Sequence, residues 1–262
     1  MTRTRDRGSR PSERDDDVER IMRRRSRRSF LTLGLSAAAG LAGWEWLKTR
    51  PQEGGVPYPI RRVLEVNERL AEAYFKEARL SPTYPREMAR EPRVNGAEGM
   101  SAGFDPTAWR LRILRSSEPT LLTLDDIRRL PRTEMTTELK CIEGWSVIVN
   151  WAGCRLGDFA AAHNLIRGDG EGAQDIRYVG LETPDRGYYV GLDIRSAMHP
   201  QTLLCYEMNG EPLSLDHGAP LRLVTTVKYG IKSIKRIGTI VFTGERPPDF
   251  WAERGYDWYA GH

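Results

Sequence analysis

The sequence predicts an α+β fold made mainly of short strands, with a basic segment ahead of it. Two observations carry this prediction. Short segments that are apolar or that alternate apolar and polar residues recur between turns rich in Gly, Pro and Asn, above all in the C-terminal half. Helical periodicity is confined to a few segments. The chain has 262 residues, 39% of them hydrophobic, and seven Trp, which is enough for a substantial core in one large domain or in two interlocked small ones.

The N-terminal segment holds the basic excess of the chain. Residues 1–28 contain eleven Arg and six acidic residues, a net charge of +5, so the remainder carries −1 of the total +4. A body without a basic stripe argues against a nucleic-acid-binding protein. Residues 1–25 are too charged to bury a core and are expected to be disordered.

A possible export signal follows these charges. Ser26-Arg-Arg-Ser-Phe-Leu leads into the mostly apolar residues 30–47 and resembles a twin-arginine signal. The resemblance implies a periplasmic or other extracytoplasmic location, and it implies a protein that acquires a cofactor before export. Residues 30–47 are close to spanning length, so both cleavage and retention as a membrane anchor remain open.

The first half of the body alternates helices and loops. Residues 49–62 are rich in Pro and Gly and are expected to be a linker. A helix is predicted over residues 64–79, a long loop over 86–106 and a half-buried strand over 109–114. A short helix with a Thr or Asp cap should occupy residues 123–130, before Pro131.

The second half is predicted to be rich in strands. Strands are expected over residues 136–141 and 145–151, on either side of Glu143-Gly144, and a helix over 156–165. Further strands are predicted at 176–181, 188–192, 203–208, 221–227 and 237–243. The predicted division is a leader at 1–48, a linker at 49–62 and one domain at 63–262.

The chain has three cysteines, Cys141, Cys154 and Cys205, and no C-x-x-C pair. This pattern supports neither a zinc knuckle nor a disulfide framework. From residue type alone, each cysteine is a small buried hydrophobe.

Three motifs resemble those of the sulfite-oxidase superfamily of molybdopterin oxidoreductases. They are Glu138-Leu-Lys-Cys-Ile-Glu-Gly-Trp-Ser with the later Trp151-Ala-Gly, the run from Met208 through Asp216-His-Gly-Ala-Pro-Leu-Arg, and Lys228-Tyr-Gly-Ile-Lys-Ser-Ile-Lys. The resemblance implies a single mixed, strand-rich molybdopterin-binding domain. We expect it to lack the immunoglobulin-like dimer domain, because little sequence follows residue 243.

The resemblance makes Cys141 the metal ligand and the catalytic residue. Molybdenum held by dithiolene sulfurs favours a further soft ligand, and a thiolate supplies it. The implied cofactor is molybdenum-molybdopterin, whose phosphate and pterin need cations and rigid hydrogen-bonding groups. The resemblance places the cofactor contacts at Asn67, Cys141, Thr183, His217, Arg222, Ser233, Ile234 and Lys235.

Several of these residues could also have purely structural roles. Asn67 lies in the segment that matches the family least well. Arg222 could form a salt bridge on a strand face, and Lys235 could be a solvated edge charge. His217 corresponds to His in the sulfite-oxidase branch and to Asn in the methionine-sulfoxide-reductase branch.

Other residues are weaker candidates for the site. His199 lies either near the site or in the core. Residue type alone suggests Tyr188, Tyr189, Tyr229 and Arg195 for the substrate entrance. Trp145 and Trp151 are expected in the core.

The reaction predicted from these motifs is oxygen-atom transfer, with reduction of a sulfoxide or similar oxide. Sulfite oxidation requires a cluster of Arg for a dianion, whereas Glu143 follows Cys141 here. The sequence has no C-x-x-C-H haem motif, so electrons should come from a separate haem protein, either soluble or in the membrane. Two alternatives remain: a sulfite-oxidase-like enzyme that reduces a cytochrome, and a cofactor-free secreted binding module.

Overall fold

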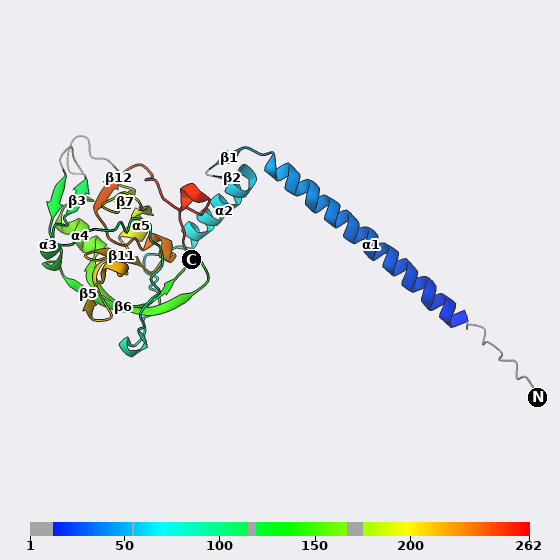
Figure 1. The fold of residues 1–262 in the computed structure, drawn as a ribbon, viewed down its shortest axis with the longest axis horizontal. Helices are drawn as coiled ribbons and strands as arrows, with labels where there is room; N and C mark the ends of the chain where they lie inside the picture. Colours follow the sequence, from blue (N-terminus) through cyan, green and yellow to red (C-terminus); the bar gives the residue numbers. More distant parts are fainter. Residues whose placement is uncertain (1–12, 54, 115–118, 167–174) are drawn as a thin grey trace, which may run out of the picture. The chain divides into compact units, whose positions relative to one another are not determined.

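The computed structural model describes residues 13–53, 55–114, 119–166 and 175–262 (Figure 1). The chain forms two compact units. One contains residues 1–52 with 57–59, and the other contains residues 53–56 with 60–262.

The first unit contains one long helix, α1 (Glu13–Lys48), so residues 13–25 are helical where disorder was expected. Arg, Glu, Leu and Ala dominate this stretch, and these residues have high helix propensity. Charged residues of opposite sign three and four positions apart add to helix stability. Residues 1–12 lie outside the described part of the chain. No helix among the described residues has the length and apolar character needed to cross a membrane.

The predicted linker contains regular structure. Strands β1 (Gln52–Glu53) and β2 (Val56–Pro57) form a two-stranded sheet, and α2 (Tyr58–Tyr74) begins directly after it. The helix therefore starts within the predicted linker and ends before residue 79. Pro59 explains the early start, because proline fits the first turn of a helix.

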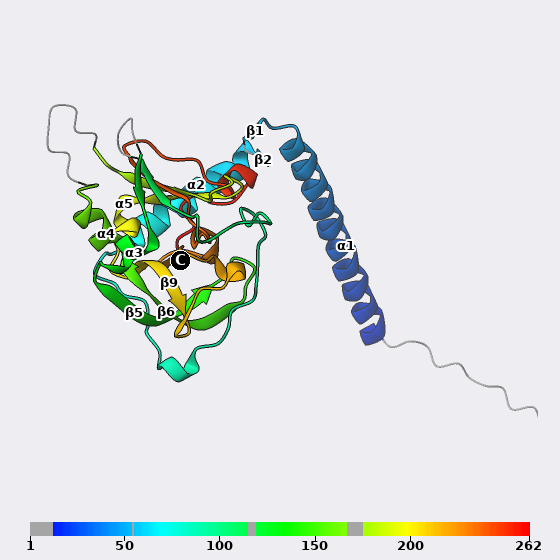
Figure 2. The same ribbon diagram turned by 60° about the vertical axis from the view of Figure 1, so that its left-hand side comes forward.

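One five-stranded sheet combines strands from the middle and from the C-terminal part of the chain. Its order is β10-β9-β6-β5, with β11 paired to β9, and all pairs are antiparallel. The strands are β5 (Arg132–Lys140), β6 (Ser146–Arg155), β9 (Thr202–Met208), β10 (Glu211–Pro212) and β11 (Arg222–Thr225). Figure 2 shows β5, β6 and β9 side by side.

The second five-stranded sheet has the order β4-β3-β12-β7-β8 and contains one parallel pair, β3 with β12. Its strands are β3 (Leu111–Leu114), β4 (Thr120–Leu122), β7 (Tyr178–Glu182), β8 (Tyr189–Asp193) and β12 (Thr239–Thr243). Short helices connect the strands: α3 (Leu124–Arg128), α4 (Leu156–Ala162) and α5 (Ile194–Ala197). The predicted α+β class is confirmed.

The main hydrophobic core joins the two sheets. Its buried members come from both, for example Leu181 and Ile240 from one sheet and Leu204 and Leu223 from the other. A smaller cluster around Trp151 covers the opposite side of the first sheet. The single-turn helices η1 (Arg86–Met88), η2 (Leu215–His217), η3 (Gly230–Lys232) and η4 (Ala252–Arg254) lie in the loops, and residues in or near all four line the site described next.

Candidate active site

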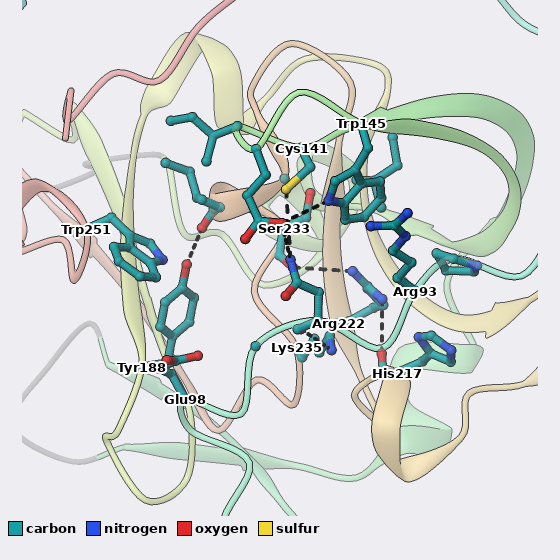
Figure 3. Close-up of a pocket in the computed structure, with 18 of the residues that line it drawn as sticks. Arg93, Glu98, Cys141, Trp145, Tyr188, His217, Arg222, Ser233, Lys235 and Trp251 are labelled. Carbon is teal, nitrogen blue, oxygen red and sulfur yellow. Dashed lines mark hydrogen bonds between the residues drawn. The ribbon is translucent and has the colours of Figure 1, made fainter.

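Cys141 lies in the turn that joins β5 to β6. Its backbone N–H donates to the carbonyl of Trp145 at 2.9 Å, and the N–H of Gly144 donates to the carbonyl of Cys141 at 3.1 Å. Gly144 has φ +87°, a left-handed conformation that glycine adopts without strain. The turn holds the half-buried thiol in a pocket of about 270 Å³ (Figure 3).

Five segments distant in sequence form the walls of this pocket. They are the loop after η1, the Cys141 turn, the turn between β7 and β8, the region from η2 through η3, and the C-terminal tail. The lining residues include Arg93, Asn95, Glu98, Cys141, Glu143, Trp145, Tyr188, His217, Arg222, Ile231, Ser233, Lys235, Trp251 and Tyr256.

Arg222, the first residue of β11, is a buried cation without a carboxylate partner in the described part of the chain. Its side chain is 3% exposed, and its Nη atoms donate to the carbonyls of His217 at 3.1 Å and Ser233 at 3.4 Å. Its guanidinium lies 4.7 Å from the centre of the Trp151 ring. Burial lowers the pKa of Arg222 to about 10. A buried guanidinium held only by carbonyls is suited to an anionic ligand.

Lys235 adds a second cation to the same pocket. Its Nζ donates to the carbonyl of Asn95 at 2.7 Å. Burial, and then repulsion from Arg222, lowers the pKa of Lys235 to about 8. Burial and repulsion from Arg222 and Lys235 hold the pKa of His217 below its ordinary value, although Glu91 Oε1, 3.6 Å from His217 Nε2, acts in the opposite direction.

The cationic part of the pocket also holds polar atoms that are buried without a hydrogen-bond partner. Among the described residues they include His217 Nε2, Arg222 Nε and Ser233 Oγ. Buried polar atoms are nearly always paired in folded proteins. Three such atoms beside two cations therefore fit a ligand that carries an anionic group and several hydrogen-bonding atoms, as a phosphate-bearing pterin does.

The other part of the pocket is acidic and aromatic. Glu143 Oε2 accepts hydrogen bonds from Trp145 Nε1 at 3.0 Å and from Asn95 Nδ2 at 3.4 Å. The same Asn95 Nδ2 lies 3.9 Å from the Cys141 sulfur. Tyr188 donates to the carbonyl of Ile231 at 2.5 Å, and burial raises the pKa of its phenol. Asn95 thus contacts both the Cys141 thiol and the Glu143 carboxylate, whose residue is exposed to solvent.

The structure brings together most of the residues predicted to bind a cofactor. Cys141, His217, Arg222, Ser233 and Lys235 all line the pocket. No two of these five residues were predicted to lie in the same helix or strand. In the structure, His217, Arg222, Ser233 and Lys235 are brought together by η2, β11 and η3.

Three predicted cofactor residues do not line it. Asn67 is exposed on α2. Thr183 is buried, and its hydroxyl donates to Asp185 Oδ1 at 2.6 Å and accepts from the N–H of Tyr188, which stabilises the turn between β7 and β8. The Ile234 side chain belongs to the main core, while its neighbours on both sides line the pocket.

Asn95 is the residue that sequence reasoning missed. It lies in the predicted loop over 86–106, which contributes four lining residues in the short stretch 93–98. The signal was available, because long loops in compact domains are often functional. Asn95, rather than Asn67, is the asparagine beside Cys141.

The weaker candidates separate clearly. Of the four residues proposed for the entrance, Tyr188 alone lines the pocket. Arg195 pairs with Glu77 at 3.0 Å, and the Tyr189 hydroxyl is hydrogen-bonded to Glu253.

His199 is a core histidine, since its Nδ1 accepts from Gln201 N–H and its Nε2 lies 3.1 Å from the carbonyl of Arg79. Trp151 is fully buried as predicted. The core prediction for Trp145 was wrong, because the side chain is half-buried in the pocket wall.

Comparison with known proteins settles the family. The family described as the oxidoreductase molybdopterin binding domain matches residues 98–251, which include Cys141 and the whole cationic part of the pocket. The chain belongs to this family of molybdopterin-binding oxidoreductases. The predicted membership of the sulfite-oxidase superfamily is confirmed, and so is the prediction of an enzyme with a molybdenum–pterin type of cofactor.

Two curated relatives are similar over most of the domain. A protein named as a subunit of a protein-methionine-sulfoxide reductase, from Azospira oryzae, is 31% identical over 191 residues, which cover 71% of this chain and 70% of the relative. The catalytic subunit of the protein-methionine-sulfoxide reductase of Campylobacter jejuni is 33% identical over 180 residues, covering 63% of this chain and 60% of the relative.

Among solved structures, the sulfane dehydrogenase of Paracoccus pantotrophus is similar with a TM-score of 0.49 and 20% identity. The similarity covers 65% of this chain and 46% of that one.

Proposed function

We propose that this oxidoreductase reduces a sulfoxide or a similar oxide by oxygen-atom transfer, outside the cytoplasm. The net reaction consumes two electrons and two protons and releases the sulfide and water. The observation that carries the proposal is Glu143, whose carboxylate is held beside Cys141 by Trp145 and Asn95. A fixed negative charge there disfavours a dianion such as sulfite and tolerates a neutral oxide.

The residues present fit the molybdopterin form of the cofactor. Arg222 and Lys235 would hold its phosphate, and His217, Ser233 and Asn95 offer hydrogen-bonding groups to the pterin. Cys141 would provide the protein thiolate to the metal. When bound, the molybdenum centre supplies two-electron oxygen-atom transfer chemistry.

The other residues bind and orient the substrate. Tyr188, Trp251 and Tyr256 form an aromatic side of the pocket that suits the apolar groups of a thioether oxide. Both curated relatives are named for the reduction of methionine sulfoxide, which supports a sulfoxide attached to an amino acid or to a protein side chain.

The electron donor and the location belong to the same proposal. The sequence has no C-x-x-C-H motif, so a separate haem protein, soluble or in the membrane, would deliver electrons. The Arg27-Arg28 pair followed by Phe30 and Leu31 supports twin-arginine export, with residues 30–47 either removed or kept as an anchor.

A substrate panel tests the reaction. Protein produced in a host that makes the cofactor should oxidise a reduced dye with methionine sulfoxide, dimethyl sulfoxide or trimethylamine oxide as acceptor. Cytochrome reduction by sulfite is measured in parallel. Turnover with sulfite alone would overturn the proposal. A molybdenum content near zero, with Cys141→Ser indistinguishable from the parent in every assay, would favour a cofactor-free binding module.

A further inference from the structure

Helix α2 presents a largely exposed apolar stripe, in which the described structure places only Arg79 over a member, 4.4 Å from the centre of the Tyr74 ring. Val63, Val66, Leu70 and Tyr74 are 58%, 44%, 64% and 63% exposed. Their spacing of three, four and four residues puts them on one face of the helix. Four large apolar side chains in one exposed row indicate a contact surface rather than scattered surface residues.

The opposite side of α2 attaches it to the domain. Arg61 donates to the carbonyls of Ala252 at 3.1 Å and Tyr256 at 3.3 Å, and Glu68 forms an ion pair with Arg246. The stripe therefore faces away from the domain while the helix itself is held in place.

Charged residues around α2 are sorted by sign. Arg62 and Arg69 are seven residues apart, each directly before a member of the stripe, so they form a basic row along one edge of it. Lys76 continues this spacing just after the helix ends. Glu65 and Glu72 lie beyond the basic row, farther from the stripe, and the Glu65 carboxylate pairs with Arg62 at 2.6 Å. Going around the helix axis from the stripe, one therefore meets apolar side chains first, then basic ones, then acidic ones.

We infer that this face of α2 docks on an anionic lipid surface. The order of the charges is that of an interfacial helix, with apolar side chains in the acyl boundary, Arg at the level of the phosphates and acids turned towards water. A second copy fits less well, because a stable dimer buries more than about 1,000 Å², and a four-residue stripe on one short helix offers less.

Docking would also orient the pocket. The segment that Arg61 holds supplies Trp251 and Tyr256 to the pocket wall. A membrane under α2 would therefore lie near the aromatic side of the pocket. This part of the inference rests on the proposed function, since it brings the site towards a haem donor in the membrane.

Hydrogen–deuterium exchange of the full chain tests the docking. The chain is mixed with vesicles of phosphatidylcholine plus phosphatidylglycerol, or of phosphatidylcholine alone. We expect slower exchange across residues 60–74 with the anionic vesicles, and no slowing there in the variant Val66→Glu/Leu70→Glu. Leu121→Glu is the matched control, since Leu121 is an equally exposed leucine on β4. Arg62→Gln/Arg69→Gln should weaken vesicle binding about fivefold for each charge removed.

Three results would overturn the inference. The first is vesicle binding without protection of residues 60–74, which would assign binding to α1. The second is protection that depends on protein concentration without vesicles, which would indicate a second copy. The third is equal protection in the parent and in Val66→Glu/Leu70→Glu. Sulfoxide reduction with a reduced dye is measured without vesicles and should be the same in parent and variant, so failure of the docking and failure of the proposed reaction are distinguishable.

Discussion

At the scale of single residues, the pocket wall holds both cations and acids. Arg222 and Lys235 form no ion pair among the described residues, although Glu98 in the same wall attracts the Lys235 charge. These two cations match the phosphate of the ligand, and Cys141 matches its metal. Glu143, which shares the Asn95 amide with Cys141, predicts which substrates the metal end accepts.

Glu143→Gln should relax discrimination against anions. Removing one charge at short range changes the binding of a small anion by about tenfold, so inhibition by sulfite or sulfate should strengthen by that factor. The KM for a neutral sulfoxide should change little. Steady-state inhibition measurements test this, with the exposed Glu87→Gln as control. Unchanged anion inhibition in Glu143→Gln would show that this carboxylate does not set substrate charge.

Lys235 should make the stability of the cofactor-free protein depend on pH. Its pKa is about 8 in the folded state and about 10.5 in the unfolded chain, so above pH 8 the unfolded chain binds more protons and the folded state gains stability as pH rises. Lys235→Met lacks this contribution. The variant should be more stable than the parent at pH 7, and the difference should shrink towards pH 10. Urea unfolding at several pH values measures this, and a difference that is constant with pH would contradict it.

About half of the site could be predicted from sequence. Cys141, His217, Arg222, Ser233 and Lys235 were predicted from motifs that resemble the sulfite-oxidase superfamily, since residue type alone left these positions with ordinary structural roles. Asn95 and Glu98 lie in the predicted loop over 86–106, whose length was a general signal of function that singled out no residue. The position of Trp145 depends on a turn whose path is set by tertiary contacts rather than by local pattern.

At the scale of elements, one buried ion pair connects two walls of the pocket. Lys232, in η3, lies 2.5 Å from Asp249, and both side chains are almost fully buried. Asp249 also accepts from the N–H groups of Gly191 and Ala252, at the start of the tail that carries Trp251. The pair therefore fixes η3 and the aromatic wall to the same strand, β8.

Lys232→Met should lower the free energy of unfolding by about 3–5 kcal/mol, because it leaves the Asp249 charge buried without a partner. Lys232→Met/Asp249→Asn should recover part of that loss. The exposed pair offers a control, since Arg195→Met should cost less than about 1 kcal/mol. Denaturant unfolding of the four proteins tests the coupling. Equal losses in the single and double variants would argue against an uncompensated charge.

Most elements of the domain were predictable because their signals are local. The alternation in residues 109–114 and the Thr123 cap have direct counterparts in β3 and in the capping box of α3. Strand β4 and helix α5 were missed, since neither is long enough to show a period. The order of strands in the two sheets comes from long-range pairing, such as β3 beside β12, which no local pattern specifies.

At the scale of the whole molecule, the chain combines a charged helix with an oxidoreductase domain. The basic excess belongs to the segment that includes α1, and the family match lies entirely in the second unit. Export, an electron donor and docking through α2 are proposals about how this domain is placed in the cell. The identity of the domain does not depend on them.

The central claim is that Cys141 is the thiolate on molybdenum. X-ray absorption at the molybdenum edge of cofactor-loaded protein tests it directly, by comparing the parent with Cys141→Ser and with Cys154→Ala as a control. We predict that Cys141→Ser retains the cofactor, has one sulfur ligand fewer and loses sulfoxide reduction, while Cys154→Ala matches the parent. The same number of sulfur ligands in the parent and in Cys141→Ser would contradict the claim.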